Sequence, residues 1–279
     1  MKLASYLQDG QARVGVVKDD GIVDSGFGGT MIALIADWPQ LREVVVRHVE
    51  KGTSRPLADV RLCAPVLRPG KIFALGLNYS DHMEESGLKA PERQVWFTKA
   101  QTSVNGPFEP ILIARNAPLV DYEVELVAVI GRGGKHISAD AAAEHVFGYC
   151  VGNDVTERLW QTATPQWSLG KSFDTHAPLG PWITTADEIE NPHDLGLRCF
   201  VNGELRQSSN TKHMIYNLWQ QIEHLSSAMT LEPGDVIFTG TPAGIGATRK
   251  PAVFLKAGDV VRCEIDQLGA IEGVMQDEV

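Results

Sequence analysis

The chain has 279 residues, a hydrophobic content of 43% and a formal net charge of −10, with a pI near 5.3. This length and composition suffice for a packed core, in one large domain or in two unequal ones. The negative charge argues against a nucleic-acid binder, and the absence of any apolar run near the roughly 20 residues of a membrane span argues against a membrane protein.

The four cysteines stand at positions 63, 150, 199 and 263, with no CxxC pair among them. This spacing is typical of reduced thiols rather than of a disulfide framework or a zinc knuckle. The N-terminus also lacks the apolar core of a signal peptide. We therefore expect a cytoplasmic protein.

Residues 1–64 are expected to form a small N-terminal α/β domain. Short strand-like runs separated by Asp-Gly turns precede two helical patterns. The strands are predicted at Leu3–Leu7, Ala12–Val17 and Ile22–Asp24, and the helices at Met31–Asp37 and Leu41–Lys51. No acidic pair or phosphate-binding loop occurs in this unit, which indicates a structural role.

The segment Pro65–Gly70 breaks both helix and strand, so we place the boundary to a larger domain, residues 65–279, there. A predicted strand, Ile72–Leu77, then runs into a polar stretch. If this stretch is helical, His82 and Glu85 stand three residues apart on one face and can meet. A histidine beside a carboxylate is a general-base arrangement, although a surface helix with an ordinary charged pair fits the pattern as well.

Further strands are predicted near Gln94–Thr98 and Pro110–Ile113, and an acidic strand over Asp121–Ile130. Side chains alternate along a strand, so one face of the acidic strand is wholly apolar while the other presents Glu123 and Glu125 side by side. Two such charges repel unless a cation lies between them, and an all-oxygen site favours Mg²⁺, Mn²⁺ or Ca²⁺. The alternative is an edge strand with a solvated acidic face.

Asp154 follows the predicted strand Val146–Val151, where it can supply a third oxygen ligand or, equally well, cap a helix or turn. Residues 168–181 are too rich in Gly and Pro for a helix or strand, and ordered loops of this kind often carry function. Asn202-Gly203 predicts a hairpin.

The C-terminal third contains a predicted amphipathic helix, Ile215–Thr230, and a strand, Val236–Thr239. The glycine-rich loop 240–246 that follows lacks the lysine of a P-loop, but its N–H groups could hold a small anion. A tight turn without any ligand is the alternative. Strands at Val260–Ile265 and Ile271–Met275 close the chain.

In their order along the chain, five motifs resemble those of the fumarylacetoacetate hydrolase family. They are Gly76-Leu77-Asn78-Tyr79-Ser80-Asp81-His82, Asp121-Tyr122-Glu123-Val124-Glu125-Leu126, Gly152-Asn153-Asp154-Val155, Lys171-Ser172-Phe173-Asp174-Thr175 and Gly240-Thr241-Pro242-Ala243-Gly244-Ile245-Gly246. The resemblance covers residue 65 to the end. It implies a mainly β, α+β fold, a mixed β-roll behind the small N-terminal domain, in a homodimer.

The resemblance also implies roles for individual residues. Glu123, Glu125 and Asp154 would bind Mg²⁺ or Mn²⁺; His82, Glu85 and Lys171 would be catalytic; Arg158, Gln161 and Thr241 would bind substrate. Glu157 and Leu159 depart from the family's usual residues. The Trp96-Phe97 pair is bulky for this position. It could narrow the distal pocket, but we expect both rings in the core.

The activity implied is hydrolysis of the C3–C4 bond of a 2,4-diketo acid, of the acylpyruvate type and with 2,4-diketo-3-deoxy sugar acids as one option, to pyruvate and a carboxylic acid. Within the same family, an oxaloacetate decarboxylase or an oxo-dienoate isomerase or hydratase remains open, as does a non-catalytic metal–dicarboxylate binding protein. We expect the stretch from Ser80 to about Ala90 to act as a lid. Replacing Glu123 by Ala should remove metal-dependent activity and largely spare the fold, because it relieves a like-charge pair.

Overall fold

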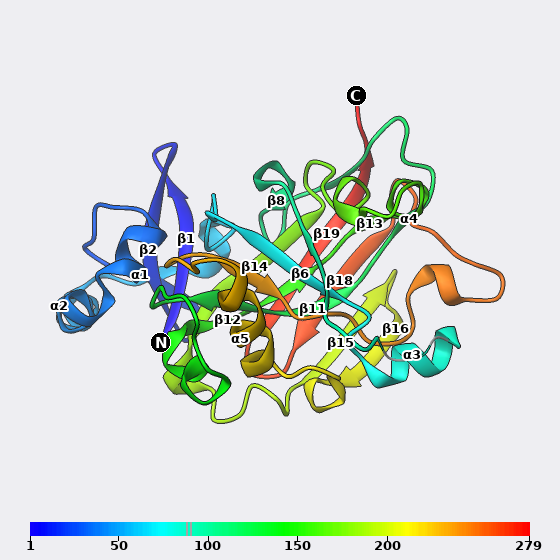
Figure 1. The fold of residues 1–279 in the computed structure, drawn as a ribbon. Coiled ribbons are helices and arrows are strands. Elements are labelled where there is room, and N and C mark those ends of the chain that lie inside the picture. The colour runs from blue at the N-terminus through cyan, green and yellow to red at the C-terminus, as the bar shows by residue number, and fades with distance from the viewer. Residues whose placement is uncertain (88, 90) are drawn as a thin grey trace.

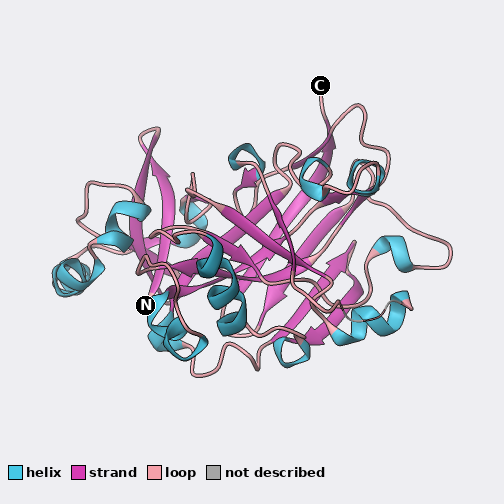
Figure 2. Ribbon diagram, in the orientation of Figure 1, coloured by secondary structure: helices cyan, strands magenta, loops and turns pink. Residues whose placement is uncertain are grey.

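The computed structural model describes residues 1–87, 89 and 91–279, and β-strands dominate this part of the chain (Figures 1 and 2). The strands form a twelve-stranded sheet, a five-stranded sheet and a two-stranded ribbon. Most helices lie at the periphery of the sheets (Figure 2). The mainly β, α+β fold expected from the sequence is confirmed.

One end of the large sheet is built from segments that lie far apart in the sequence. Its strands here are β12 (Val146–Asn153), β11 (Val124–Ile130), β17 (Val236–Phe238), β6 (Ile72–Gly76) and β7 (Val95–Thr98), in that spatial order. β17 and β6 pair in parallel and the other neighbours are antiparallel. The ends of these strands therefore bring motifs separated by more than a hundred residues to one place.

The strand β11 separates two hydrophobic cores, and all seven of its residues are buried. Leu126, Ala128 and Ile130 pack into the core shared with the five-stranded sheet, whereas Val127 and Val129 pack into the core shared with the N-terminal helices. Burying each Leu, Ile or Val side chain contributes about 1.5–3 kcal/mol. The period-two alternation is confirmed, and the edge strand with a solvated acidic face is excluded.

The N-terminal strands continue the large sheet. β1 (Lys2–Gln8) pairs with β2 (Gln11–Lys18) on one side and with β14 (Ala177–Thr185) on the other. β3 (Gly21–Asp24) follows, and then the helices α1 (Met31–Ala36) and α2 (Trp38–Lys51). α2 begins three residues earlier than expected, because Pro39 is accommodated within its first turn. The division at residue 64 and the homodimer remain predictions.

The five-stranded sheet has the order β16-β15-β18-β19-β9. β15 (Gly196–Val201) and β16 (Glu204–Asn210) form the predicted hairpin, in which Asn202 and Gly203 both have positive φ, as the twist of a two-residue turn requires. β18 (Val260–Ile265) and β19 (Gly269–Asp277) form a second hairpin. β9 (Ile111–Ile113) pairs in parallel with β19 at the edge.

The helix α5 (Leu218–Ala228) begins later than expected because a capping box formed by Asn217 and Gln220 fixes its start. Its buried face presents Leu218, Ile222 and Leu225. The segment Ala139–His145 forms a 3₁₀-helix. The remaining elements are β4 (Arg55–Pro56), β5 (Arg61–Cys63), α3 (Ser80–Ser86), β8 (Val104–Asn105), β10 (Val120–Asp121), β13 (Thr156–Glu157) and α4 (Arg158–Thr162).

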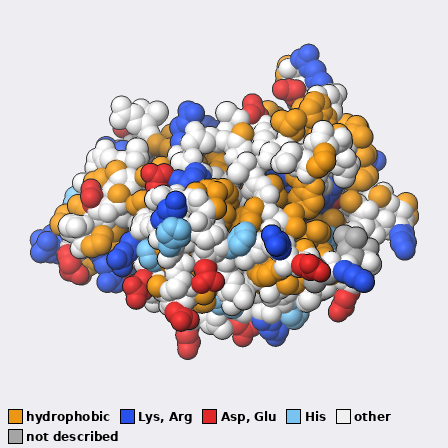
Figure 3. Space-filling model, viewed as in Figure 1, with side chains coloured by type: hydrophobic (Ala, Val, Ile, Leu, Met, Phe, Trp, Pro, Cys, Tyr) orange, Lys and Arg blue, Asp and Glu red, His pale blue; other side chains and the backbone are white. Residues whose placement is uncertain are grey.

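Acidic and basic side chains are interspersed on the face of the molecule shown in Figure 3. Within the described residues, no helix is both long and apolar enough to span a membrane. The mixture of acidic and basic side chains leaves no large surface of a single charge on this face.

Candidate functional site

Three carboxylates meet where β11 begins and β12 ends. The expected strand over Asp121–Ile130 is interrupted, so that Glu123 lies just before β11 and Glu125 is its second residue. The antiparallel register places Val124 opposite Asn153, and the Asp154 N–H donates to the Glu123 carbonyl at 2.9 Å. One oxygen from each of Glu123, Glu125 and Asp154 lies within 4.8 Å of the others, and all three side chains are buried.

Basic side chains surround these carboxylates. Lys171 Nζ lies 2.7 Å from Glu123 Oε2 and 2.5 Å from Asp154 Oδ2, so it bridges two members of the trio. Lys99 Nζ lies 2.6 Å from the other oxygen, Oδ1, of Asp154. With Arg158 and Asp121, which the next paragraph describes, the cluster contains three basic and four acidic side chains.

Arg158 is the third cation and extends the cluster. Its Nη2 lies 2.7 Å from Glu123 Oε1 and 2.9 Å from Asp121 Oδ2. Its Nη1 donates to Gln161 Oε1 at 3.0 Å, since the two residues stand three apart on α4. With its guanidinium held by three partners, Arg158 is rigidly placed against the trio.

The environments of Glu123 and Glu125 push their pKa values in opposite directions. Burial acts to raise the pKa of Glu123, but the charges of Lys171 and Arg158 outweigh it and hold that pKa at about 2. Burial and the neighbouring charges of Asp154 and Glu123 raise the pKa of Glu125 well above its ordinary range.

Glu125 is therefore the carboxylate that the protein's own cations leave least neutralised. Its Oε2 accepts a hydrogen bond from the Gly240 N–H at 2.8 Å. Convergent, buried, all-oxygen ligands with an uncompensated carboxylate suit a hard divalent cation such as Mg²⁺ or Mn²⁺. The residues present thus fit the metal that the resemblance implies.

His82 and Glu85 lie on α3, which ends at Gly87 in the left-handed conformation. His82 is buried, and its Nδ1 lies 3.8 Å from Glu85 Oε2, an ion-pair rather than a hydrogen-bond distance. Burial is the largest influence on the pKa of His82 and lowers it, so the imidazole is neutral at pH 7. The expected lid extends over Leu88 and Ala90, which lie outside the described residues.

The glycine-rich loop binds carboxylates of the protein itself. Its N–H groups donate to Glu125 from Gly240, to Glu85 from Gly244 and to Asp121 from Gly246 and Ala247. Donors expected to hold a small external anion are therefore already engaged. The loop instead connects α3, the strand β11 and the Arg158 cluster.

Thr241, expected to bind substrate, lies in the same loop and lines the cavity. Its hydroxyl donates to the Val124 carbonyl at 3.0 Å and accepts from Gln207 Nε2 at 2.8 Å. Gln207 Oε1 in turn accepts from the Val124 N–H at 2.9 Å. Gln207 thus supports the start of β11, a role that nothing in its sequence context indicated.

One small cavity of about 50 Å³ gathers these groups. All the residues proposed as catalytic or substrate-binding line it except Glu85, as do two of the three proposed metal ligands: His82, Glu123, Glu125, Arg158, Gln161, Lys171 and Thr241. Since one water needs roughly 10–15 Å³ by this measure, the cavity holds only a few waters. It therefore suits a small substrate.

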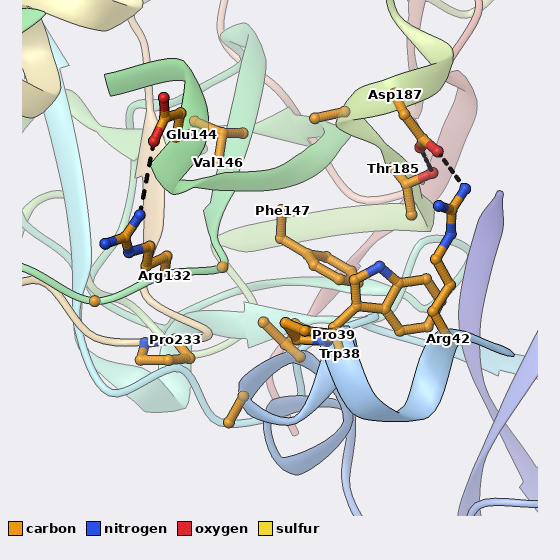
Figure 4. Close-up of a pocket in the computed structure, with 15 residues that line it drawn as sticks. Trp38, Pro39, Arg42, Arg132, Glu144, Val146, Phe147, Thr185, Asp187 and Pro233 are labelled. Atoms are coloured by element: carbon orange, nitrogen blue, oxygen red, sulfur yellow. Dashed lines mark hydrogen bonds and ion pairs between the residues drawn. The ribbon is translucent and has the colours of Figure 1, made fainter. Parts of the chain in front are cut away.

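A larger cavity, about 530 Å³, lies elsewhere, between α2 and the beginning of β12 (Figure 4). Trp38 and Phe147 meet edge-to-face at its floor, with ring centroids 5.4 Å apart. Its arginines are paired with carboxylates, Arg42 with Asp187 at 2.8 Å and Arg132 with Glu144 at 3.6 Å. None of the proposed site residues lines it, so we assign function to the smaller cavity, where the titratable groups converge.

Phe97 is a core residue, as expected, and it also lines the small cavity, which was the alternative left open for this pair. Its ring lines the small cavity, and Lys171 Nζ lies 4.9 Å from the ring centroid in a cation–π contact. Trp96 does pack in the core as expected, edge-to-face against Phe73. Alternation along β7 explains the difference, since neighbouring side chains point to opposite faces.

His176 is expected to make the protein less stable in acid. The side chain is fully buried beside the Leu112 carbonyl, and burial lowers its pKa to about 4. Between about pH 6.5 and pH 4 the unfolded chain binds a proton that the folded protein does not, so the free energy of unfolding falls by up to about 3 kcal/mol as the pH drops. Urea unfolding of His176→Asn across this range should show a smaller loss.

The matched control for this prediction is His213→Asn, since the side chain of His213 is 42% exposed. That variant should retain the pH dependence of the parent protein. An undiminished dependence in His176→Asn would contradict the assignment.

Comparison with known proteins adds to this geometry. The model of the fumarylacetoacetate hydrolase C-terminal domain matches residues 71–276. An oxaloacetate tautomerase from Bos taurus is 43% identical over 266 residues, covering 89% of this chain and 85% of the relative. One from Xenopus laevis is 50% identical over 216 residues, covering 77% and 68%.

Solved structures agree in fold over the whole chain. Fumarylacetoacetate hydrolase from Exiguobacterium antarcticum is 37% identical with a TM-score of 0.90, and coverage of both chains is 100%. Maleylpyruvate hydrolase from Sphingobium sp. SYK-6, solved with a manganese(II) ion and pyruvate, is 32% identical with a TM-score of 0.86 and the same coverage.

The relatives correct the expected location. The tautomerases from Bos taurus, Rattus norvegicus and Homo sapiens are all named as mitochondrial proteins. The cytoplasmic expectation is therefore wrong on this comparison. It rested on cysteine spacing and the N-terminal composition, and neither feature distinguishes between compartments that keep thiols reduced.

Proposed function

Because the chain belongs to the fumarylacetoacetate hydrolase family, we propose that it is a metal-dependent enzyme that interconverts the keto and enol forms of a short 2-keto diacid, oxaloacetate. The observation that supports this most directly is the meeting of the carboxylate trio with His82 and Lys171 at one small cavity. The names of the tautomerase relatives point to the same substrate.

Charge at the site is consistent with an acidic substrate. With a divalent cation bound, the cluster would carry five positive charges against the four carboxylates. An anionic keto acid would restore the balance. A neutral substrate would leave an uncompensated positive charge in a buried site, which is unfavourable.

Each residue has a role in this proposal. Glu123, Glu125 and Asp154 hold the metal, which when bound supplies a Lewis acid for the 2-keto oxygen. His82, whose pKa burial lowers, accepts the proton from C3 of the keto form to leave an enolate, and delivery of this proton to the 2-oxygen gives the enol; the reverse transfers regenerate the keto form. Lys171 places its ammonium where the enolate charge develops, which is where electrostatic stabilisation is most effective.

Hydrolysis of the C3–C4 bond of a 2,4-diketo acid is the second candidate, and it uses the same residues. Here His82 would take its proton from water rather than from carbon. The proximity of Glu85 to His82 favours this reading, as does the resemblance to a maleylpyruvate hydrolase solved with manganese and pyruvate. The two reactions share the enolate and differ in the need for a water molecule.

The test is an assay of the purified protein with Mg²⁺, with Mn²⁺ and after removal of metal by EDTA. We expect accelerated keto–enol interconversion of oxaloacetate, followed by ultraviolet absorbance, that vanishes with EDTA and returns when metal is added. Pyruvate release from acylpyruvates, measured in parallel, reports hydrolysis. Metal binding without turnover of any keto acid would instead support a binding protein, and turnover unaffected by EDTA would contradict the metal's role.

A further inference from the structure

Charged and apolar groups both line the small cavity. Besides the carboxylates and Lys171, its lining includes Leu75 and Gly76 of β6, Phe97 of β7 and Trp167. The Phe97 and Trp167 rings lie 5.7 Å apart between centroids at a tilt of 54°. A substrate held by its acidic end at the charged groups would have these two rings beside the rest of its chain.

The indole of Trp167 packs directly against the backbone of Gly76, which we call the seat of the ring. A Cβ at Gly76 would lie 2.3 Å from Cζ3 and 3.0 Å from Cη2 of that ring, distances that real Cβ atoms essentially never show. Gly76 is not among the glycines with positive φ, so its backbone does not demand glycine. Glycine is needed at this position because the Trp167 ring packs directly on the strand and leaves no space for a Cβ.

Phe97 and Trp167 differ in how far a substitution would disturb the rest of the site. Phe97 is buried and supports the Lys171 ammonium, so it is tied to the catalytic side of the site. Trp167 is only half-buried, in a short 3₁₀-helix, Trp167–Leu169, at the end of a loop. None of the described side-chain hydrogen bonds uses its indole N–H, so the ring's position depends on packing against Phe97 and Gly76.

We infer that Trp167, seated on Gly76, is a specificity-determining residue that limits the substrate to short 2-keto diacids by closing the cavity beyond the fourth carbon. This inference rests on the proposed function and names the residue that sets substrate length. A cavity of about 50 Å³ leaves no room for the acyl chain of a longer diketo acid while the ring is in place.

The test uses 2-keto diacids that differ from oxaloacetate by one, two and three added methylenes. Exchange of the C3 protons in D₂O, followed by NMR, gives kcat/KM for each acid without a separate coupling enzyme. Trp167→Ala should raise kcat/KM for the longer acids relative to oxaloacetate by about 10- to 200-fold, the range for a pocket that must accommodate an extra methylene. Leu169→Ala, an exposed change two residues away, should leave the ratio unchanged.

Gly76→Ala tests the seat itself. The added methyl group must displace the indole, so it should alter the length preference in the parent protein and have little further effect in a Trp167→Ala background. Additive effects in the double variant would show that Gly76 and Trp167 act independently and would overturn the inference. Circular dichroism and thermal unfolding establish that each variant is folded.

Binding of the same acids to the Mn²⁺-loaded protein, measured by calorimetry, separates this inference from the proposed function. If oxaloacetate is turned over but Trp167→Ala leaves the length preference unchanged in both turnover and binding, the inference fails and the proposed function stands. If no keto acid is turned over, the proposed function fails, and the change in relative affinity alone decides the role of Trp167.

Discussion

Replacing Glu125 by Gln should abolish metal binding and lower keto acid turnover by at least about 10²-fold while leaving the fold intact. The pKa of Glu125 is raised, and its Oε2 accepts a backbone hydrogen bond from Gly240. A neutral amide of the same shape keeps that acceptor but gives up the charge that a divalent cation needs.

Glu123→Gln should also lose the metal, but at a cost in stability. Lys171 and Arg158 both bind the Glu123 carboxylate, so an amide leaves two buried cations short of a partner. Breaking a buried ion pair from one side typically costs about 3–5 kcal/mol. This changes the expectation from the sequence alone, that loss of Glu123 spares the fold by relieving repulsion with Glu125.

Calorimetric titration with Mn²⁺ and urea unfolding of the metal-free proteins measure the two effects separately. Glu144→Gln serves as the control, because that glutamate is exposed and pairs with Arg132, which is not part of the charge cluster. Equal stability of the Glu123 and Glu125 variants would show that the cations do not depend on Glu123 as the distances indicate.

Replacing His82 by Ala should lower both oxaloacetate tautomerisation and diketo acid hydrolysis by about 10²–10⁴-fold, the usual effect of losing a general base. Decarboxylation of oxaloacetate needs an electron sink but no base, so it should fall much less. Lys171→Ala should weaken all three reactions, because each develops enolate charge near that ammonium.

The pH dependence provides an independent check on His82. A general base acts in its neutral form, and burial lowers the pKa of His82 below its ordinary value. The acidic limb of kcat/KM in the parent protein should therefore lie below about pH 6.5. His82→Gln, which keeps volume and polarity, should lose activity as the alanine variant does, whereas unchanged hydrolysis would point to a different base.

Much of the site could be anticipated because it depends on short-range periodicity. Alternation along the acidic strand correctly placed Glu123 and Glu125 on one face and gave the other face only apolar residues. The spacing of three between His82 and Glu85 correctly predicted that they face each other. Both relationships follow from the side-chain period of a strand or a helix, which can be read directly from the spacing of residues in the sequence.

What could not be anticipated depends on tertiary contacts. Lys99 and Asp121 lie at the two ends of the charge cluster, yet each follows a strand-like run that is equally compatible with an exposed polar residue. The glycine-rich loop was expected to hold an external anion or nothing, because its sequence does not reveal which carboxylates fold against it. The importance of Gly76 appears only once Trp167, some ninety residues later, is seen on top of it.

The basic side chains around the carboxylates also bear on how the protein is made. In many small metal-binding domains the ion is needed for folding, since the ligands repel one another without it. Here Lys99, Lys171 and Arg158 already compensate most of the buried negative charge. We therefore expect the metal-free chain to fold, and the proposed divalent cation to bind afterwards and to exchange without unfolding.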